Sequence, residues 1–584
     1  MRDLCSSFAS HVDSFETQTR KKGPWSAFNR HSTPVTLCCN SKHTKNNTET
    51  FIHVPGRTMP YLDSGVASTE ALEPVELRWS VRKRFYEPIV LLQALTRACM
   101  HNHVQKVLEH TPEVTFQTSQ QLFRSFLNNL AQICDNDRGG KTVTAVVAIQ
   151  YPDHVQYRFA SNQRTANELA SMKTFIKNIL ESLATWTKAA SRTVEDVILR
   201  EIIAFNRPRL QLYVRAICSH SQECLKAPAE VITTQVREEL KNLLNLALKA
   251  DDRELEEAAF CENCTKLMLS VKALSKTEAH KVLRDKANAH DGQATSWSEL
   301  RHASGRLLSY FQGVKILVEA RKYWDTLFYE FKVVSILSSD AIQALPRNNL
   351  TAEAIMGRMT RDPERGSAYK RRVQELQHFG DLDHTIQAQV RNKCFLPIVH
   401  AEAIVHQSII SDPDPGSELG SLHPSNFFNG DKYIGCSKPT CRLCHYYFEA
   451  CADGIQVRQT HRNLYPNWRV PDVYQHEGEE AVKKRENIIN KMLVPIREDT
   501  FRTIDDKIPE RRPHDSNTDP TYDHATSVGY MEEIHERLLE GMGQLSIQDG
   551  ETDDDSSKFC DSQGDLAEVD EDDDDDDEGG VRLF

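Results

Sequence analysis

The spacing of hydrophobic positions changes several times along the chain, and each change predicts a different kind of element. From about residue 75, apolar side chains recur at helical spacing, as in Leu91, Leu92 and Leu95. Between residues 142 and 162 the apolar period falls to two on both sides of Pro152-Asp153. A period of two on either side of a turn dipeptide predicts a β-hairpin.

Helical spacing then returns over roughly 165–380, and the pattern becomes mixed over 394–500. In the mixed part, short apolar runs and turn residues predict helices at 395–410, 441–450 and 479–493 and short strands at 432–435 and 455–457. The fold class expected from this order is α/β, with a large, mainly helical part.

Composition divides the chain into four parts. Residues 1–70 are rich in Ser, Thr, Asn and His and are expected to be disordered. Residues 71–390 form a mainly helical region that includes the hairpin at 142–162, and residues 391–505 form a compact α/β core. Residues 506–584 are expected to be largely disordered and end in an acidic tail.

The net charge of −13 belongs to that tail. Residues 551–584 hold 16 acidic and 2 basic side chains, a net of −14, so residues 1–550 carry −13 − (−14) = +1. The acidic balance therefore does not argue against a phosphate-bearing substrate. No apolar run approaches the roughly 20 residues of a membrane helix. With no secretory signal at the start and an odd count of 15 cysteines, we expect an intracellular protein, in the cytoplasm or nucleus, with reduced thiols.

The strongest chemical signal is His400-Ala401-Glu402 followed by Cys441-Arg442-Leu443-Cys444. One histidine and two cysteines can hold a zinc ion and leave a position open for water, and a nearby acid can move the protons of that water. Cys441 and Cys444 are three residues apart, so both can face one metal from a first helical turn. We therefore predict His400, Cys441 and Cys444 as zinc ligands and Glu402 as the acid/base.

These residues resemble the zinc deaminases of bases and nucleosides, which carry H-x-E followed by P-C-x-x-C. The likeness is greatest to a fungal, deaminase-like branch that has H-A-E, a strand ending in Ser-Lys before C-x-x-C, and a stretch similar to His461–Pro471. It implies a cytidine deaminase-like three-layer α/β/α domain with both motifs at helix starts. The activity it implies is hydrolytic deamination of a nucleobase in a nucleotide, nucleoside or nucleic acid.

Several further residues are candidates for substrate binding. Relatives often place an asparagine at the end of the second strand, which points to Asn162. Arg458 and His461 are candidates for contacts with a phosphate or nucleic-acid backbone, and Trp468 for stacking on a base. The competing interpretations are solvated surface for the charged residues and core packing for the tryptophan.

The sequence departs from the family pattern at one position, and it leaves two alternatives open. Proline directly precedes the first cysteine in the family, whereas here Thr440 lies between Pro439 and Cys441. In the first alternative, Cys436 and His445 join Cys441 and Cys444 in a closed structural zinc site.

In the second alternative, the chain is a catalytically inactive scaffold on a deaminase fold, with protein partners recruited by its helical region and acidic tail. The helical region itself is expected either as an insertion before His400 or as a separate N-terminal domain.

Overall fold

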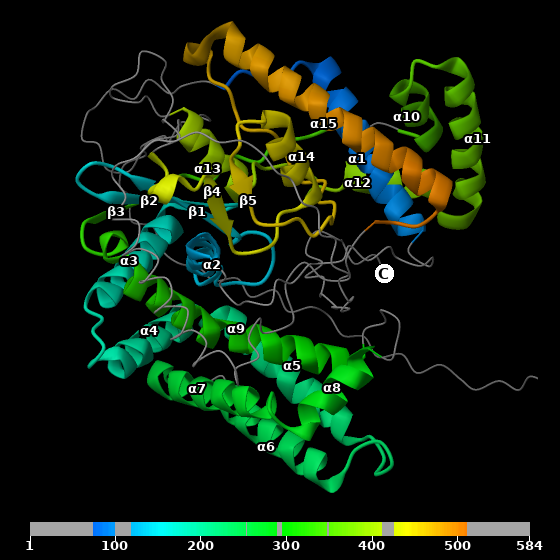
Figure 1. The fold of residues 1–584 in the computed structure, drawn as a ribbon. Coiled ribbons are helices and arrows are strands. Elements are labelled where there is room, and N and C mark those ends of the chain that lie inside the picture. Colours follow the sequence, from blue (N-terminus) through cyan, green and yellow to red (C-terminus); the bar gives the residue numbers. More distant parts are fainter. Residues whose placement is uncertain are drawn as a thin grey trace, which may run out of the picture. The chain divides into compact units, whose positions relative to one another are not determined.

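The computed structural model describes residues 74–510, except 100–117, 253, 289–294, 347–349 and 412–425. The expected disordered N-terminal segment and the acidic tail lie outside the described residues. Within them, a small mixed sheet lies among many helices (Figure 1). The prediction of an α/β fold is confirmed.

The predicted hairpin is the centre of this sheet. Strands β1 (Thr144–Gln150) and β2 (Val155–Ser161) pair antiparallel, with Thr144 opposite Ser161. The strand order is β3-β2-β1-β4-β5, where β3 is Phe331–Ser335, β4 is Tyr433–Cys436 and β5 is Gln456–Val457. The β1–β4 and β1–β2 pairs are antiparallel and the two outer pairs are parallel. The sheet thus joins strands from both sides of residue 390.

Alternate residues of β1 enter two different cores, so helices cover both faces of the sheet. Val146 and Ala148 pack in one core with helices α2 (Ser119–Gln132), α3 (Ala166–Ala184) and α9 (Ser296–Tyr323). Ala145 and Val147 pack in the other core with helices α1 (Trp79–Ala98), α13 (Ala401–Ile410), α14 (Arg442–Cys451) and α15 (Gly478–Asp506). This is the alternation expected of a strand that is buried on both faces.

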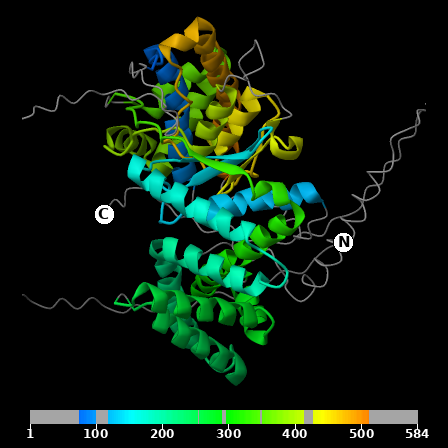
Figure 2. The same cartoon turned by 90° about the vertical axis from the view of Figure 1, so that its left-hand side faces the viewer.

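Most of the helical region lies between β2 and β3 in sequence. Besides α3 and α9 it contains α4 (Ser191–Phe205), α5 (Arg207–Leu225), α6 (Thr234–Ala250), α7 (Glu257–Leu274) and α8 (Glu278–Asn288). The chain leaves the sheet after β2, forms these helices and returns to pair β3 with β2. Figure 2 shows α4–α8 on one side of the sheet and α1, α14 and α15 on the other.

Three further helices complete the second layer. They are α10 (Ala352–Met359), α11 (Pro363–Gly380) and α12 (Leu382–Arg391); all three pack against α1, and α11 also packs against α15.

Three elements differ from the sequence prediction, and one of them is α15, which was expected to end at residue 493 and continues to Asp506. Strand β3 was not predicted, because five residues inside a long helical pattern carry little periodic signal. The helix expected at 395–410 begins only at Ala401, because Ile398 pairs with Trp468 in a β-bridge. The backbone N–H of Ile398 donates to Asn467 and its carbonyl accepts from Arg469, which holds this segment extended.

The approach of α2 to β4 depends on a glycine. A Cβ atom on Gly435 would lie 2.6 Å from the backbone carbon of Leu127, closer than such atoms approach. The side-chain oxygen of Asn128 on the same helix accepts a hydrogen bond from the backbone N–H of Cys436 at 3.0 Å. Helix α2 therefore fixes the strand that leads to the cysteine motif.

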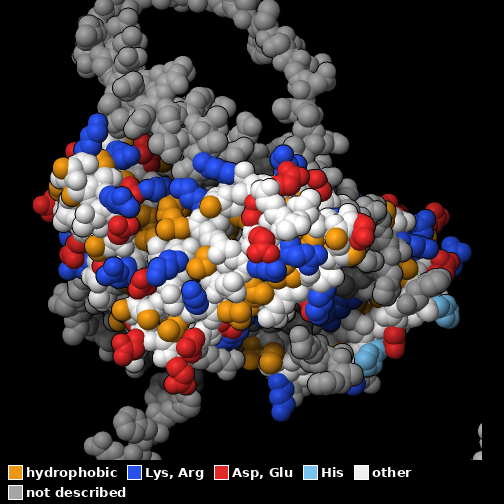
Figure 3. Space-filling view, turned by 90° about the horizontal axis from the view of Figure 1, so that it is seen from below, with side chains coloured by type: hydrophobic (Ala, Val, Ile, Leu, Met, Phe, Trp, Pro, Cys, Tyr) orange, Lys and Arg blue, Asp and Glu red, His pale blue; other side chains and the backbone are white. Residues whose placement is uncertain are grey.

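The surface described mixes charge of both signs. On the face seen in Figure 3, Lys and Arg side chains are interspersed with Asp and Glu and with small apolar areas. Among the helices that the structure describes, none has the length and apolar character needed to cross a membrane.

Candidate metal centre

Both halves of the motif lie at helix N-termini, as the resemblance implies. His400 is the residue before α13, with extended backbone angles, and Cys441 occupies the same position before α14. The Cys441 sulfur accepts a hydrogen bond from the backbone N–H of Cys444 at 3.5 Å. A helix N-terminus favours negative charge, so this position suits a thiolate ligand.

The three predicted ligand side chains converge on one point. The Nδ1 atom of His400 lies 3.5 Å from the Cys441 sulfur and 3.5 Å from the Cys444 sulfur. Tetrahedral zinc, with bonds of about 2.3 Å to sulfur and about 2.0 Å to nitrogen, separates its ligand atoms by about 3.5 Å. The donor set and its spacing therefore fit zinc.

Glu402 lies beside this cluster. Its Oε2 atom is 3.9 Å from the Cys444 sulfur, and the side chain is 4% exposed. Two residues after His400, it projects from the first turn of α13 toward the same space. Burial raises the pKa of Glu402 to about 6. The carboxylate is thus adjacent to the three ligands and shielded from solvent.

The electrostatics favour a charged sulfur at Cys441. Burial alone would raise the pKa of its thiol, but the hydrogen bond from Cys444 and the charge of His400 lower that pKa well below its usual value. Burial likewise acts to lower the pKa of His400, yet the negative charge on Cys441 raises it overall. The thiolate and the imidazole therefore stabilise each other's charge.

Trp468 has a structural place that the sequence did not reveal. Its side chain is 0% exposed, and the indole Nε1–H donates a hydrogen bond to the Cys444 sulfur at 3.1 Å. A ring with no exposed surface offers no face to a base, so the core-packing interpretation describes this residue. Hydrogen bonds to metal ligands orient them and tune the metal.

Asn162 connects the end of β2 to the first motif. Its side-chain oxygen accepts from the backbone N–H of Ala401 at 2.8 Å, and its side-chain nitrogen donates to the carbonyl of Gly140 at 2.7 Å. It is therefore next to His400, where the resemblance places a substrate-binding asparagine. The same contacts also fix the start of α13.

Arg458 and His461 contact the residues that precede the cysteine motif. Arg458 donates to the carbonyl of Ser437 at 3.2 Å, and buried His461 accepts from the backbone N–H of Asn463 at 2.9 Å. The backbone N–H of His461 also donates to the carbonyl of Thr440 at 3.1 Å. Both residues support the segment that carries Cys441.

The same segment explains why threonine replaces the family proline. The backbone N–H of Thr440 donates to the carbonyl of Gln459 at 3.1 Å, as part of a parallel bridge to Thr460. Proline has no N–H and would lose this bond. The substitution therefore preserves a local strand pairing beside the site.

The alternative ligand set is not assembled in the described structure. His445 pairs with Glu449 at 3.2 Å, one turn further along α14. Neither it nor Cys436 belongs to the groups of metal-capable side chains found among the described residues, whereas His400, Cys441 and Cys444 form one such group. The open three-ligand arrangement is the one that the fold brings together.

A second group of potential ligands contains His406, Cys451 and Asp453. The Nε2 atom of His406 lies 2.6 Å from an Asp453 oxygen, and its Nδ1 lies 2.8 Å from the Tyr447 hydroxyl. A separation of 2.6 Å is that of a hydrogen bond and is too short for two ligands of one zinc ion. This group connects α13 to the residues after α14, and both ring nitrogens of His406 have hydrogen-bond partners, as expected of a structural histidine.

Two long-range contacts also escaped prediction. Trp468 lies 24 residues beyond Cys444, and the Gly140 carbonyl that holds Asn162 belongs to a loop with no motif. The one available signal was the likeness of the stretch His461–Pro471, which suggested a role for Trp468 but not its partner.

The comparison with protein families agrees with the motif. Residues 399–472 match a family model described as OTT_1508_deam-like deaminase. This segment contains all four motif residues and Trp468, and it carries a deaminase-like domain. No curated protein matches the chain, and no solved structure matches it either.

Proposed function

We propose that the protein is a zinc-dependent hydrolytic deaminase of a nucleobase, in a nucleotide, nucleoside or nucleic acid. The observation that carries the proposal is the convergence of His400, Cys441 and Cys444 at zinc-ligand spacing, with Glu402 buried beside them. The deaminase family match over 399–472 supports the reaction class. The finer placement, in a fungal branch of the cytidine deaminase-like superfamily, rests on the motif likeness.

Each residue of the site has a distinct task in this reaction. A zinc ion held by His400, Cys441 and Cys444 would lower the pKa of a bound water toward neutrality. Glu402 accepts a proton from the attacking water and delivers protons to the ring nitrogen and the departing ammonia. The burial of Glu402 keeps bulk water from competing for those protons.

The surroundings hold these groups in place. Asn162 fixes the backbone after His400 and is the candidate contact to the sugar or base. The cysteine motif and the residues before it are held by hydrogen bonds from Arg458, His461 and Trp468. We assign the last two to positioning rather than to substrate contact, because their side chains are buried.

The test is a substrate screen on zinc-loaded, full-length protein. Ammonia release is measured with cytosine and adenine nucleosides, their nucleotides, and single-stranded DNA and RNA. Wild type is expected to deaminate at least one of them. Glu402→Ala is expected to retain zinc and to lose about 10²–10⁴-fold in rate. Equal rates for wild type and Glu402→Ala at equal zinc content would refute the role of Glu402.

The screen also separates the enzyme from its main rival, an inactive deaminase-fold scaffold with structural zinc. The retained glutamate favours the enzyme, because a purely structural site does not need a buried carboxylate beside its ligands. The absence of ammonia release by zinc-loaded wild type from every substrate in the screen would favour the scaffold interpretation. Protein partners would then be sought through the helical region and the acidic tail.

A further inference from the structure

A cavity of about 530 Å³ lies beside α13. Its walls come from α13, the end of β3, the segment 470–477, the first turns of α15, and Tyr447 of α14. None of the four motif residues lines it. Tyr447 lines the cavity and Trp468 does not, and the centres of their two rings are 5.9 Å apart.

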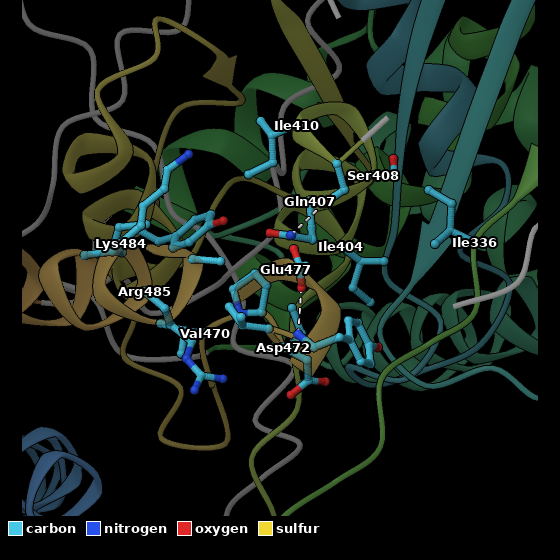
Figure 4. A pocket seen from close by; sticks show the side chains of 18 of the residues that line it. Ile336, Ile404, Gln407, Ser408, Ile410, Val470, Asp472, Glu477, Lys484 and Arg485 are labelled. Atoms are coloured by element: carbon cyan, nitrogen blue, oxygen red, sulfur yellow. Dashed lines mark hydrogen bonds between the residues drawn. The ribbon is translucent and has the colours of Figure 1, made fainter. Parts of the chain in front are cut away.

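The walls suit an apolar molecule. Aliphatic side chains from four segments face the cavity: Ile336, Val399, Ile404, Ile410, Val470, Val473 and Ile488. Figure 4 shows Ile336 and Ser408 on one side and Lys484 and Arg485 on the other. Pockets of roughly 300–1,000 Å³ with mostly apolar walls and a few polar groups are typical small-molecule sites.

The carboxylates of the cavity already have partners. Asp472 accepts two hydrogen bonds from Arg469, at 2.6 and 2.9 Å. One oxygen of Glu477 accepts from the backbone N–H of Tyr474 at 2.6 Å (Figure 4). Asp472 is still the negative charge that acts most strongly on Arg485, and the hydrogen bonds of its carboxylate go to Arg469.

Arg485 is the group whose hydrogen bonds are incomplete. The side chain is 6% exposed, and its Nη2 donates to the carbonyl of Val75 at 2.8 Å. Its buried Nε–H has no acceptor among the residues that the structure describes. A buried guanidinium with an unused donor is costly unless an acceptor completes it. With exposed Lys484 next to it, Arg485 makes this wall cationic.

The charges that line the cavity balance, because Lys484 and Arg485 contribute two positive charges and Asp472 and Glu477 two negative ones. The feature that favours a carboxylate is therefore the unused Nε–H donor of Arg485, not an excess of positive charge.

We propose that this cavity is a second ligand site, which binds a small carboxylate with an apolar body, the carboxylate accepting from Arg485 and the apolar body lying against the aliphatic wall. It is independent of the deaminase chemistry, because it shares no residue with the metal centre.

The experiment uses decanoate as the probe and full-length protein, with binding measured by isothermal titration calorimetry. Decanol has the same chain without the charge and serves as the matched ligand. Arg485→Met removes the guanidinium and keeps the length of the side chain. Arg497→Met is the matched control on the same helix, because Arg497 also has a buried Nε without a described acceptor but does not line the cavity.

Decanoate is expected to bind wild type with one site per chain and more tightly than decanol. Arg485→Met should weaken the affinity for decanoate about tenfold or more, as loss of a charge-assisted hydrogen bond does. Its affinity for decanol should not change, and Arg497→Met should bind decanoate as wild type does. Failure of decanoate to bind wild type, equal affinity for decanol, or equal affinity in Arg485→Met would each overturn the proposal.

A second variant covers the case in which Arg485→Met does not fold. Ser408→Phe fills the cavity from half-buried Ser408 on α13 and leaves Arg485 intact. It should abolish decanoate binding while retaining the wild-type circular dichroism spectrum. Undiminished binding in folded Ser408→Phe would show that decanoate binds elsewhere and would refute the assignment.

Discussion

The hydrogen bond from Trp468 to Cys444 gives a quantitative prediction about the metal centre. Trp468→Phe removes the indole N–H, which lies 3.1 Å from the sulfur, and keeps an aromatic ring in a site with no exposed surface. Loss of a partner that supports a metal ligand typically costs 10–100-fold in affinity, or about 1.4–2.8 kcal/mol. A hydrogen bond to a charged group is worth about 1.5–3 kcal/mol, so the two magnitudes agree.

The assay is competition for zinc with a chromophoric chelator, supported by the visible spectrum of the cobalt-substituted protein. Trp468→Phe should bind zinc 10–100-fold more weakly, and its sulfur-to-cobalt charge-transfer band should move to lower energy, because the thiolate has lost a hydrogen-bond donor. Trp324→Phe is the control, since Trp324 is also buried but packs against Phe123 and Phe428. Unchanged zinc affinity and spectrum in folded Trp468→Phe would refute the reasoning.

Three further outcomes concern stability. Gly435→Ala should cost about 1–3 kcal/mol, measured by urea unfolding, because the added Cβ meets the backbone of α2; an unchanged midpoint would contradict this close approach. Arg209→Met should lower the free energy of unfolding by about 3–5 kcal/mol, because Arg209 is 2% exposed and its ion pair with buried Asp135 is 3.0 Å long. The double variant with Asp135→Asn should recover part of this loss. No recovery in the double variant would argue against the ion pair.

Burial acts to raise the pKa of Asp453, but the hydrogen bond from His406 lowers it overall. The ionised carboxylate therefore stabilises the fold above the unfolded-state pKa of Asp453, and this stabilisation is lost as pH falls through the lower folded-state pKa. Asp453→Asn should remove this acid-dependent part of stability, and an unaltered pH profile would count against it.

The sequence predicted most where the signal is local. Cys441 and Cys444 are three residues apart, and His400 and Glu402 are two apart, so each pair is positioned by one turn of a helix. The hairpin at 142–162 was equally readable, because its strands alternate on both sides of a turn. Spacing of this kind depends only on neighbouring residues, so the sequence is enough to predict it.

What escaped prediction depends on partners far apart in the chain. Strand β3 exists because it pairs with β2, more than 170 residues earlier, and nothing in its five residues announces that partner. The helix at 395–410 starts late because Ile398 pairs with Trp468. For Trp468 the sequence allowed both base stacking and core packing, and the sulfur that accepts from its indole N–H comes near it only in the folded chain. Tertiary pairing overrides local propensity in the first two cases.

The central claim is that a water at the His400, Cys441 and Cys444 site displaces ammonia from a base with the help of Glu402. The most direct measurement is the mass of the product base formed in water enriched in the heavy oxygen isotope, on protein of known zinc content. Wild type should place one heavy oxygen in the base for each ammonia released, and Glu402→Gln at equal zinc should produce almost none. Ammonia release without the label, or full labelling by Glu402→Gln, would contradict the account.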